Sequence, residues 1–253
     1  MARTGALVLL AWVFLLAVAE TRFGAGGKSG ASDRRLFTNF SFAAIVLGVG
    51  SLFPIARLAA SATSESWGIG ITRAVHLPWL ALFCIAILGE TFAAYWAHRI
   101  SHGTPWLWRL HRVHHADQLV DLSTSFRNHP LELIITIPVS AAVVVILGTP
   151  QSVVMAMQTL LVAVTLWQHA DIALPVRFDR TLAFVVVTPR LHRLHHNPAR
   201  VIHDSNYGEL LTLWDRLFGT FNPRDGRKRV GLDGQVALPD RLLQQIWSPI
   251  HAA

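Results

Sequence analysis

The stretch of sequence that decides the fold runs from Leu131 to Trp167 and reads LELIITIPVSAAVVVILGTPQSVVMAMQTLLVAVTLW. A helix needs about 20 apolar residues to cross a bilayer, and each half of this stretch comes close to that length. Only Thr149 and Pro150 separate the halves. The sequence therefore predicts two antiparallel membrane spans, residues 131–148 and 151–167, joined by a turn too tight to hold a further domain.

The composition supports a membrane protein. The 253 residues are 52% hydrophobic and 15% charged, whereas a soluble domain carries roughly a quarter charged residues. Three further segments, residues 5–19, 40–62 and 76–96, could also cross a bilayer. The first resembles a secretory signal peptide, but only Arg3 precedes it and four basic residues follow, which favours an uncleaved span. We expect an all-α integral membrane protein with four to five transmembrane helices.

The basic residues are distributed unevenly around these spans. With an outside amino terminus, residues 20–38, 97–129 and 171–253 lie inside and hold 19 of the 22 Lys and Arg residues. The shorter inside segments alone hold 8, against 3 outside (Arg3, Arg57 and Arg73). The positive-inside rule then places the long loops in the cytoplasm, and a bacterial inner membrane is expected. This topology explains the net charge of +7 without a nucleic-acid partner.

Histidine is the unusual residue, with 13 copies in the chain. Eight of them form three short boxes, His98-x-x-x-His102, His111-x-x-His114-His115 and His192-x-x-His195-His196. Helical neighbours at i, i+3 and i+4 lie close together, and all three boxes fall at the inner end of the predicted bundle. Neutral imidazole is the commonest metal ligand, and eight ligands exceed what one ion takes. The boxes therefore predict two metal ions at a cytoplasmic, histidine-rich helical cap.

Imidazole ligands suit iron, zinc, copper or nickel. No acidic residue stands between the histidines as it does in the His-Glu-x-x-His motif of zinc hydrolases. A paired redox metal beside a bilayer favours oxygen chemistry on an apolar substrate. Zinc is expected as a substitute in overproduced protein, because it binds nitrogen more strongly than ferrous iron does. Cys84, the single cysteine, excludes a thiolate cluster or a disulfide framework.

From about Leu88 to Phe221 the chain resembles the fatty acid hydroxylase and sterol desaturase superfamily of integral-membrane di-iron enzymes. Besides the boxes, the similarity covers the motifs Asn-His-Pro-Leu-Glu at 128–132, Gln-His-Ala-Asp at 168–171, Thr-Pro-Arg at 188–190, Asp-Ser-Asn-Tyr-Gly at 204–208 and Leu-Trp-Asp-Arg-Leu-Phe-Gly-Thr at 213–220. The resemblance implies two irons and reductive activation of O2, with hydroxylation or desaturation of a lipid C–H bond. It matches the eight box histidines to iron ligands, and His169 to a further one.

Other residues are expected to support the ligands. His129, where the chain re-enters the membrane, is either a ligand or a residue that orients one. Ligating imidazoles usually donate their other nitrogen to a carboxylate or carbonyl. The nearest candidates in sequence are Asp117, Asp121, Asp171, Asp204 and Asn206, with Glu132 less favoured. No separate acid or base is assigned, and Arg99, Arg112 and Arg193 could meet a lipid headgroup.

We interpret residues 1–253 as one membrane domain. It comprises amino-terminal spans (1–84), a catalytic region (85–221) and a polar carboxy-terminal tail (222–253). A lipid hydroxylase is the favoured function, and a desaturase with the same site is the alternative. A metal transporter or a non-catalytic metal-binding protein is the alternative of another class, although transporter ligands normally lie near the bilayer midplane. No Gly-x-Gly-x-x-Gly fingerprint is present, so an external electron donor is implied, a ferredoxin or a cytochrome with its reductase.

Overall fold

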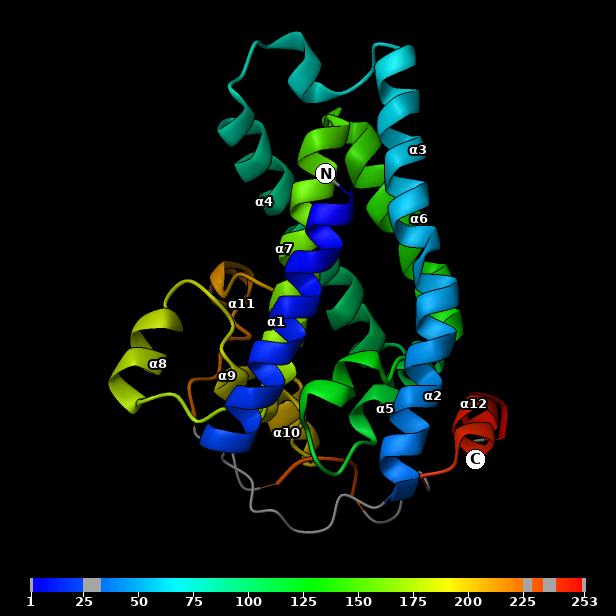
Figure 1. The fold of residues 1–253 in the computed structure, drawn as a ribbon, viewed down its shortest axis with the longest axis vertical. Coiled ribbons are helices and arrows are strands. Elements are labelled where there is room, and N and C mark those ends of the chain that lie inside the picture. Colours follow the sequence, from blue (N-terminus) through cyan, green and yellow to red (C-terminus); the bar gives the residue numbers. More distant parts are fainter. Residues whose placement is uncertain (1, 25–32, 225–228, 234–239, 252–253) are drawn as a thin grey trace.

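A computed structural model describes residues 2–24, 33–224, 229–233 and 240–251. These residues form helices and connecting loops, and their only β-type pairing is an isolated bridge between Val186 and Leu211. The predicted all-α class is thus confirmed. Figure 1 shows an elongated bundle with a broader end, where the short helices gather.

Four helices are long and apolar enough to cross a membrane: α1 (Ala2–Phe23), α4 (Trp79–Gly103), α6 (Pro130–Leu147) and α7 (Gln151–His169). They include four of the five predicted spans. Their outer surfaces remain apolar and exposed, as at Leu10 and Phe14 of α1, which are 66% and 68% exposed. Such surfaces are stable only against lipid or another apolar partner, so the bundle has the surface of a membrane protein.

The predicted span at residues 40–62 is not one helix. It is divided between α2 (Asp33–Gly50) and α3 (Leu52–Ser66), which meet at Ser51 and lie end to end in Figure 1. Pro54 has no backbone N–H to donate to the carbonyl group of Gly50, and glycine itself weakens a helix. The interruption corrects the expectation of a single uninterrupted span here.

The predicted hairpin between α6 and α7 is confirmed. Gly148 ends α6 with a left-handed backbone conformation (φ 74°), and α7 begins two residues beyond Thr149. Gly70, just before the 3-10 helix η1 (Ile71–Ala74), lies so close that a Cβ on it would be 2.2 Å from the Gly148 Cα. Glycine is therefore required where these two loops touch at the narrow end of the bundle.

The broad end holds the remaining elements (Figure 1). They are α5 (Pro105–His115), η2 (Leu122–Phe126), α8 (Val176–Leu182), α9 (Pro189–His195), α10 (Arg200–His203), α11 (Leu213–Leu217) and α12 (Leu242–His251). The last of these is a helix inside the segment expected to be a polar tail, and it exposes apolar Leu243 and Trp247. Residues 225–228 and 234–239 of that segment lie outside the described part of the chain.

Candidate metal centre

The structure gathers nine histidines into two neighbouring groups at the broad end of the bundle. The five-histidine site comprises His98, His102, His111, His115 and His195. The four-histidine site comprises His114, His169, His192 and His196. Within each site, the nitrogens that could bind a metal all lie within 4.8 Å of one another. All eight box histidines and His169 are therefore brought together as the sequence predicted.

Each element supplies its histidines from a fixed place. His98 and His102 lie in the last turns of α4, where the helix leaves the apolar region, and His169 is the final residue of α7. The second box lies on α5 and the third on α9, which starts with Pro189 after the capping residue Thr188. The ends of two spans and two short helices thus converge on one centre.

The two His-x-x-His-His boxes divide in complementary ways. On α5, His111 and His115 enter the five-histidine site, whereas His114 enters the four-histidine site. On α9 the division is reversed, because His192 and His196 enter the four-histidine site and His195 the five-histidine site. Residues i and i+4 lie on one line along a helix, and residue i+3 points to one side of it. Each box therefore contributes to both sites.

The distances between Nε2 atoms fit ligands that share one ion. They are 3.0 Å from His98 to His111 and 3.2 Å from His111 to His115. In the four-histidine site they are 3.1 Å from His114 to His169 and 2.9 Å from His169 to His192. Metal–nitrogen bonds of about 2.1 Å at right angles place neighbouring nitrogens about 3 Å apart. The donor sets present suit two divalent ions.

Two further nitrogens support this assignment. The Nε2 atoms of His102 and His195 are buried in the five-histidine site and have no hydrogen-bond partner. Buried polar atoms in native proteins are nearly always satisfied, so these two indicate a missing partner. A bound metal ion would supply one.

The five-histidine site is oriented from outside by carboxylates and by one loop. His102 Nδ1 lies 3.2 Å from Asp204, and His111 Nδ1 lies 2.7 Å from Glu132. The Nδ1 atoms of His98 and His195 contact the backbone carbonyl oxygens of Tyr207 and Ser205, at 2.9 and 2.8 Å. The Asp-Ser-Asn-Tyr-Gly motif at 204–208 therefore holds three histidines of this site at once through their Nδ1 atoms, and their Nε2 atoms stay free to bind a metal.

A second motif holds this loop in place. The Asp215 carboxylate accepts hydrogen bonds from the backbone N–H groups of Tyr207 and Gly208, at 2.8 and 2.9 Å, and from the Thr220 hydroxyl group. Trp214 donates its indole N–H to Thr91 on α4 at 3.0 Å. The 213–220 motif thus supports the centre indirectly, by fixing the loop that orients its ligands.

The four-histidine site has different outer partners. His169 Nδ1 lies 2.8 Å from the Thr165 carbonyl oxygen, and His114 Nδ1 lies 3.3 Å from that of Arg127. The Nδ1 atoms of His192 and His196 are buried and have no partner among the described residues. No carboxylate hydrogen-bonds to this site among the contacts of the described residues.

Burial keeps five of the box histidines outside the spans neutral. It lowers the pKa values of His114, His115, His192, His195 and His196 well below the usual 6.5, and the neighbouring imidazoles lower these pKa values further. Metals bind the neutral form, so ligands of this kind are ready to bind at neutral pH without first losing a proton.

Some predicted residues have other roles. His129 lies outside both sites, because its Nδ1 accepts from the Leu131 N–H and its Nε2 contacts the Ile246 carbonyl oxygen. Asp117 and Asp121 both pair with Arg35 of α2. Asp171 pairs with Arg193 at 2.5 Å. These contacts join the histidine-bearing segments to the rest of the fold.

The remaining candidates are also placed by the structure. Asn206 has a positive φ of 56° and bonds to backbone groups of Leu191 and Asn222, which stabilises the loop. Arg112 donates to the Ser248 carbonyl group of α12, and Arg99 donates to the Tyr95 hydroxyl group. A role for the three box arginines in binding a headgroup thus has no support in these contacts.

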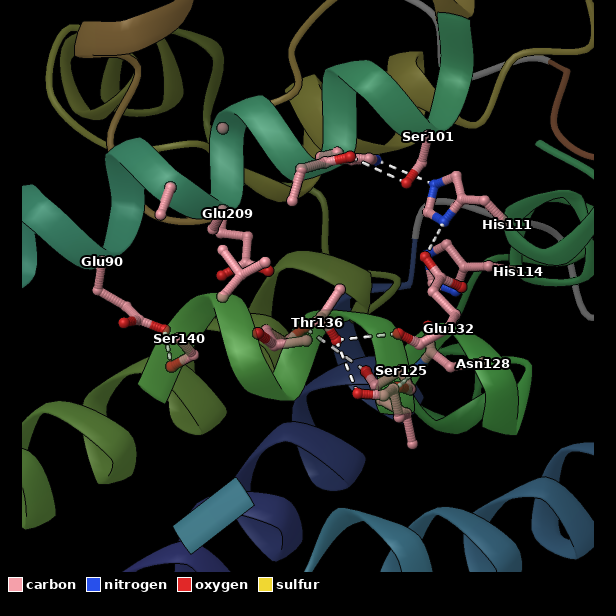
Figure 2. A pocket seen from close by; sticks show the side chains of 18 of the residues that line it. Glu90, Ser101, His111, His114, Ser125, Asn128, Glu132, Thr136, Ser140 and Glu209 are labelled. Atoms are coloured by element: carbon pink, nitrogen blue, oxygen red, sulfur yellow. Dashed lines mark hydrogen bonds and ion pairs between the residues drawn. The ribbon is translucent and has the colours of Figure 1, made fainter. Parts of the chain in front are cut away.

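A cavity of about 240 Å³ adjoins both sites and extends between α4, α6 and α7. Its far end holds Arg57 of α3, which pairs with Glu90 of α4, while the Ser140 hydroxyl group donates to Glu90 at 2.6 Å. Figure 2 shows Glu90 and Ser140 at one end and His111 and His114 at the other, with Glu209 between them. Arg57 therefore lies inside the bundle and not among the outside loops to which the charge count assigned it.

The sequence analysis missed this polar cavity. One signal was present, because an ionisable residue such as Glu90 inside an apolar span is costly and usually functional. Glu209 had no comparable signal, since it lies in a loop and only the tertiary fold turns it inward.

The fold and the site define a class, helical membrane proteins with a histidine-rich centre for metals at one end of the bundle. The fatty acid hydroxylase family matches residues 83–220, more than half of the chain. The chain belongs to this family, as its motifs predicted. No solved structure matches it significantly.

Several characterised proteins are similar to this chain. Ornithine lipid hydroxylase OlsE of Rhizobium tropici is 29% identical over 202 residues, which cover 76% of this chain and 58% of the relative. Alkylglycerol monooxygenase is 30% identical in Danio rerio, over 69% of this chain and 37% of the relative. The human alkylglycerol monooxygenase is also 30% identical, over 63% of this chain and 35% of the relative. The chain thus spans little more than half of the bacterial relative and about a third of the vertebrate ones.

Proposed function

We propose that this protein is a membrane-bound di-iron monooxygenase that hydroxylates a lipid C–H bond. The observation that carries the proposal is the pair of adjoining histidine sites at the end of a cavity between membrane-spanning helices. Family membership and the names of the similar proteins, two kinds of lipid oxygenase, support it.

In this proposal, one iron is held by His98, His102, His111, His115 and His195, and the other by His114, His169, His192 and His196. The bound irons would supply the reductive activation of O2 that a lipid C–H bond requires. The overall reaction consumes the lipid, O2, two electrons and two protons, and it forms the alcohol and one water. An external reductant, a ferredoxin or a cytochrome with its reductase, is proposed to deliver the electrons.

The chain's own residues have three tasks in this reaction. Asp204, Glu132 and the carbonyl groups of the 205–207 loop fix the imidazole rings, so that little rearrangement is needed when the metals bind. The walls formed by α4 and α6 separate the reacting carbon from bulk water. The cavity lies between the spans α4, α6 and α7, so in this proposal the lipid enters it sideways from the bilayer.

Lipid profiling tests the proposal. Cells that express the parent chain should accumulate a lipid with one additional oxygen atom, and cells that express His195→Ala should not. Desaturation is the alternative outcome of the same site, and it would yield a lipid that has lost two hydrogens instead. Identical lipid profiles from the two strains would contradict the proposal.

We further propose that the histidine end faces the cytoplasm, on the basis of the charge distribution. In a Cys84→Ser background, Val201→Cys and Ile71→Cys would place cysteines at opposite ends of the bundle, at positions 87% and 67% exposed. An impermeant reagent added to intact cells should label residue 71 and leave residue 201 unlabelled. The reverse pattern would overturn the orientation.

A further inference from the structure

Glu209 is a carboxyl group that faces the cavity and has no hydrogen-bond partner among the described residues. Its side chain keeps accessible surface, yet the residues on both sides of it in sequence are buried, and that surface lines the cavity. Figure 2 shows Glu209 directed into the space near Glu90 and Thr136. A carboxyl group that has accessible surface in a cavity and no protein partner is available to bind a ligand there.

The backbone around Glu209 is fixed more firmly than a surface loop requires. Gln168 of α7 donates its side-chain N–H groups to the carbonyl oxygens of Glu209 and Val187. Gly208 donates to Asp215, and a Cβ on Gly208 would lie 2.5 Å from the Leu211 carbonyl oxygen. The same loop that orients the five-histidine site therefore also sets the position of Glu209.

The other carboxyl groups of the cavity already have partners. Glu90 is paired with Arg57 and accepts from Ser140, and Glu132 contacts His111 Nδ1. The Oε2 atoms of Glu90 and Glu132 have no hydrogen-bond partner in the described part of the chain, but each of these groups is held through its Oε1 atom. Glu209 is thus the cavity carboxyl that has no hydrogen-bond partner on either oxygen among the described residues.

The charge of Glu209 suits a polar ligand. Burial and the nearby Glu90 carboxylate raise the pKa of Glu209 to about 7, although the Arg57 guanidinium group lowers it. The carboxyl group can consequently accept a hydrogen bond when ionised and donate one when protonated, near neutral pH.

We propose that Glu209 binds a hydrogen-bond-donating group, hydroxyl or amine, in the polar part of the lipid substrate, and thereby positions a neighbouring C–H bond at the histidine sites. This inference rests on the proposed function and specifies its substrate. The cavity wall on α4 extends from Glu90 to His98, which is about 12 Å along the helix axis. A group held at Glu209 therefore lies within about 12 Å of the carbon that reacts. The lipid is oxidised in its headgroup or in the part of the chain next to it, not near the end of a long acyl chain.

Binding to zinc-loaded protein tests the inference without requiring turnover. The probes are 1-O-dodecylglycerol, which offers hydroxyl groups, and an ornithine lipid, which offers an amine. Each is compared with a capped form, the di-O-methyl ether and the N-acetyl derivative respectively. Dissociation constants are measured in detergent for the parent protein, for Glu209→Gln, and for Glu65→Gln as a control at an exposed position.

At least one uncapped lipid should bind the parent protein about tenfold more tightly than its capped form, because the capped form cannot donate a hydrogen bond to the Glu209 carboxyl group. Glu209→Gln should bind that lipid about tenfold more weakly while keeping its metal content, and Glu65→Gln should match the parent. The arm that responds shows whether the donor is a hydroxyl group or an amine. Equal binding of capped and uncapped lipids by the parent, or an unchanged affinity in Glu209→Gln, would overturn the inference.

Turnover with the same lipid separates positioning from stability. Glu209→Gln should raise KM about tenfold with a smaller change in kcat, whereas a structural defect would lower the fraction of active, metal-loaded protein. Glu209-dependent binding without any oxidation by iron-loaded parent protein would leave this inference standing and contradict the proposed function. Oxidation of the lipid without Glu209-dependent binding would support the proposed function and contradict this inference.

Discussion

The two histidine sites share the boxes of α5 and α9 but are supported differently. In the five-histidine site, the Nδ1 atoms of His102 and His111 contact the carboxylates of Asp204 and Glu132, whereas the four-histidine site is oriented by the backbone carbonyl groups of Arg127 and Thr165. A carboxylate partner makes an imidazole more basic and fixes its orientation more firmly than a carbonyl partner does. We therefore expect the two proposed metal ions to be unequal, with the five-histidine site binding its ion more tightly.

Among the predicted changes, removal of a proposed metal ligand should have the largest effect on the two sites. His195→Ala removes one nitrogen from the five-histidine site. The metal content should therefore fall by about one ion per chain and the activity at least 100-fold. Metal per chain is measured on purified protein by elemental analysis. The matched control is His129→Asn, which preserves a side-chain acceptor for the Leu131 N–H. Full occupancy in His195→Ala, or loss of metal in His129→Asn, would contradict the assignment of ligands.

Removal of an outer partner should affect one site and spare the other. Asp204→Asn should weaken metal binding at the five-histidine site by about 10- to 100-fold and leave the four-histidine site unchanged. In competition with a chelator, the variant should lose one ion at a lower chelator concentration than the parent does. It should lose the second ion at the same chelator concentration as the parent. Asp233→Asn, at a residue in an exposed ion pair with Arg229, serves as the control. Equal weakening of both ions would show that the sites are not independently supported.

The pH dependence of stability in the metal-free protein should show a smaller effect. In the metal-free protein, burial holds the pKa of His196 well below 6.5, whereas the unfolded chain binds a proton at about that value. The unfolded state therefore gains protons as the pH falls through about 6.5, and the stability of the fold decreases. The midpoint temperature of thermal unfolding should therefore decrease as the pH is lowered from about 7.5 to about 5.5.

The slope of that decrease identifies the groups responsible. His196→Gln should make it shallower, because one buried group no longer takes up a proton on unfolding. His76→Gln, at an exposed histidine near the opposite end of the bundle, should leave the slope as it is in the parent. A parent midpoint that is constant with pH would show that the buried imidazoles are not held neutral.

The gathering of the box histidines at one end could be predicted from the sequence, because helical spacing fixes which histidines share a face and the hydrophobic spans fix the end at which they meet. The division of each box between two sites could not, since it depends on how α5 and α9 cross. Asp204 could be named in advance by its place near a box, but Glu132 follows the second box by seventeen residues and reaches His111 only through the packing of α6. The break between α2 and α3 had a local signal in Gly50 and Pro54. The position of Glu209 at the cavity had none and is decided by tertiary contacts.

The central claim is that the paired sites insert an oxygen atom from O2 into a lipid, and labelled O2 tests it most directly. Cells expressing the parent chain or His195→Ala are grown under labelled oxygen gas, and their lipids are analysed by mass spectrometry. The parent should yield a hydroxylated lipid that carries one labelled oxygen atom, and the variant should yield none. An unlabelled product with a new double bond, or a labelled product from both strains, would contradict the claim.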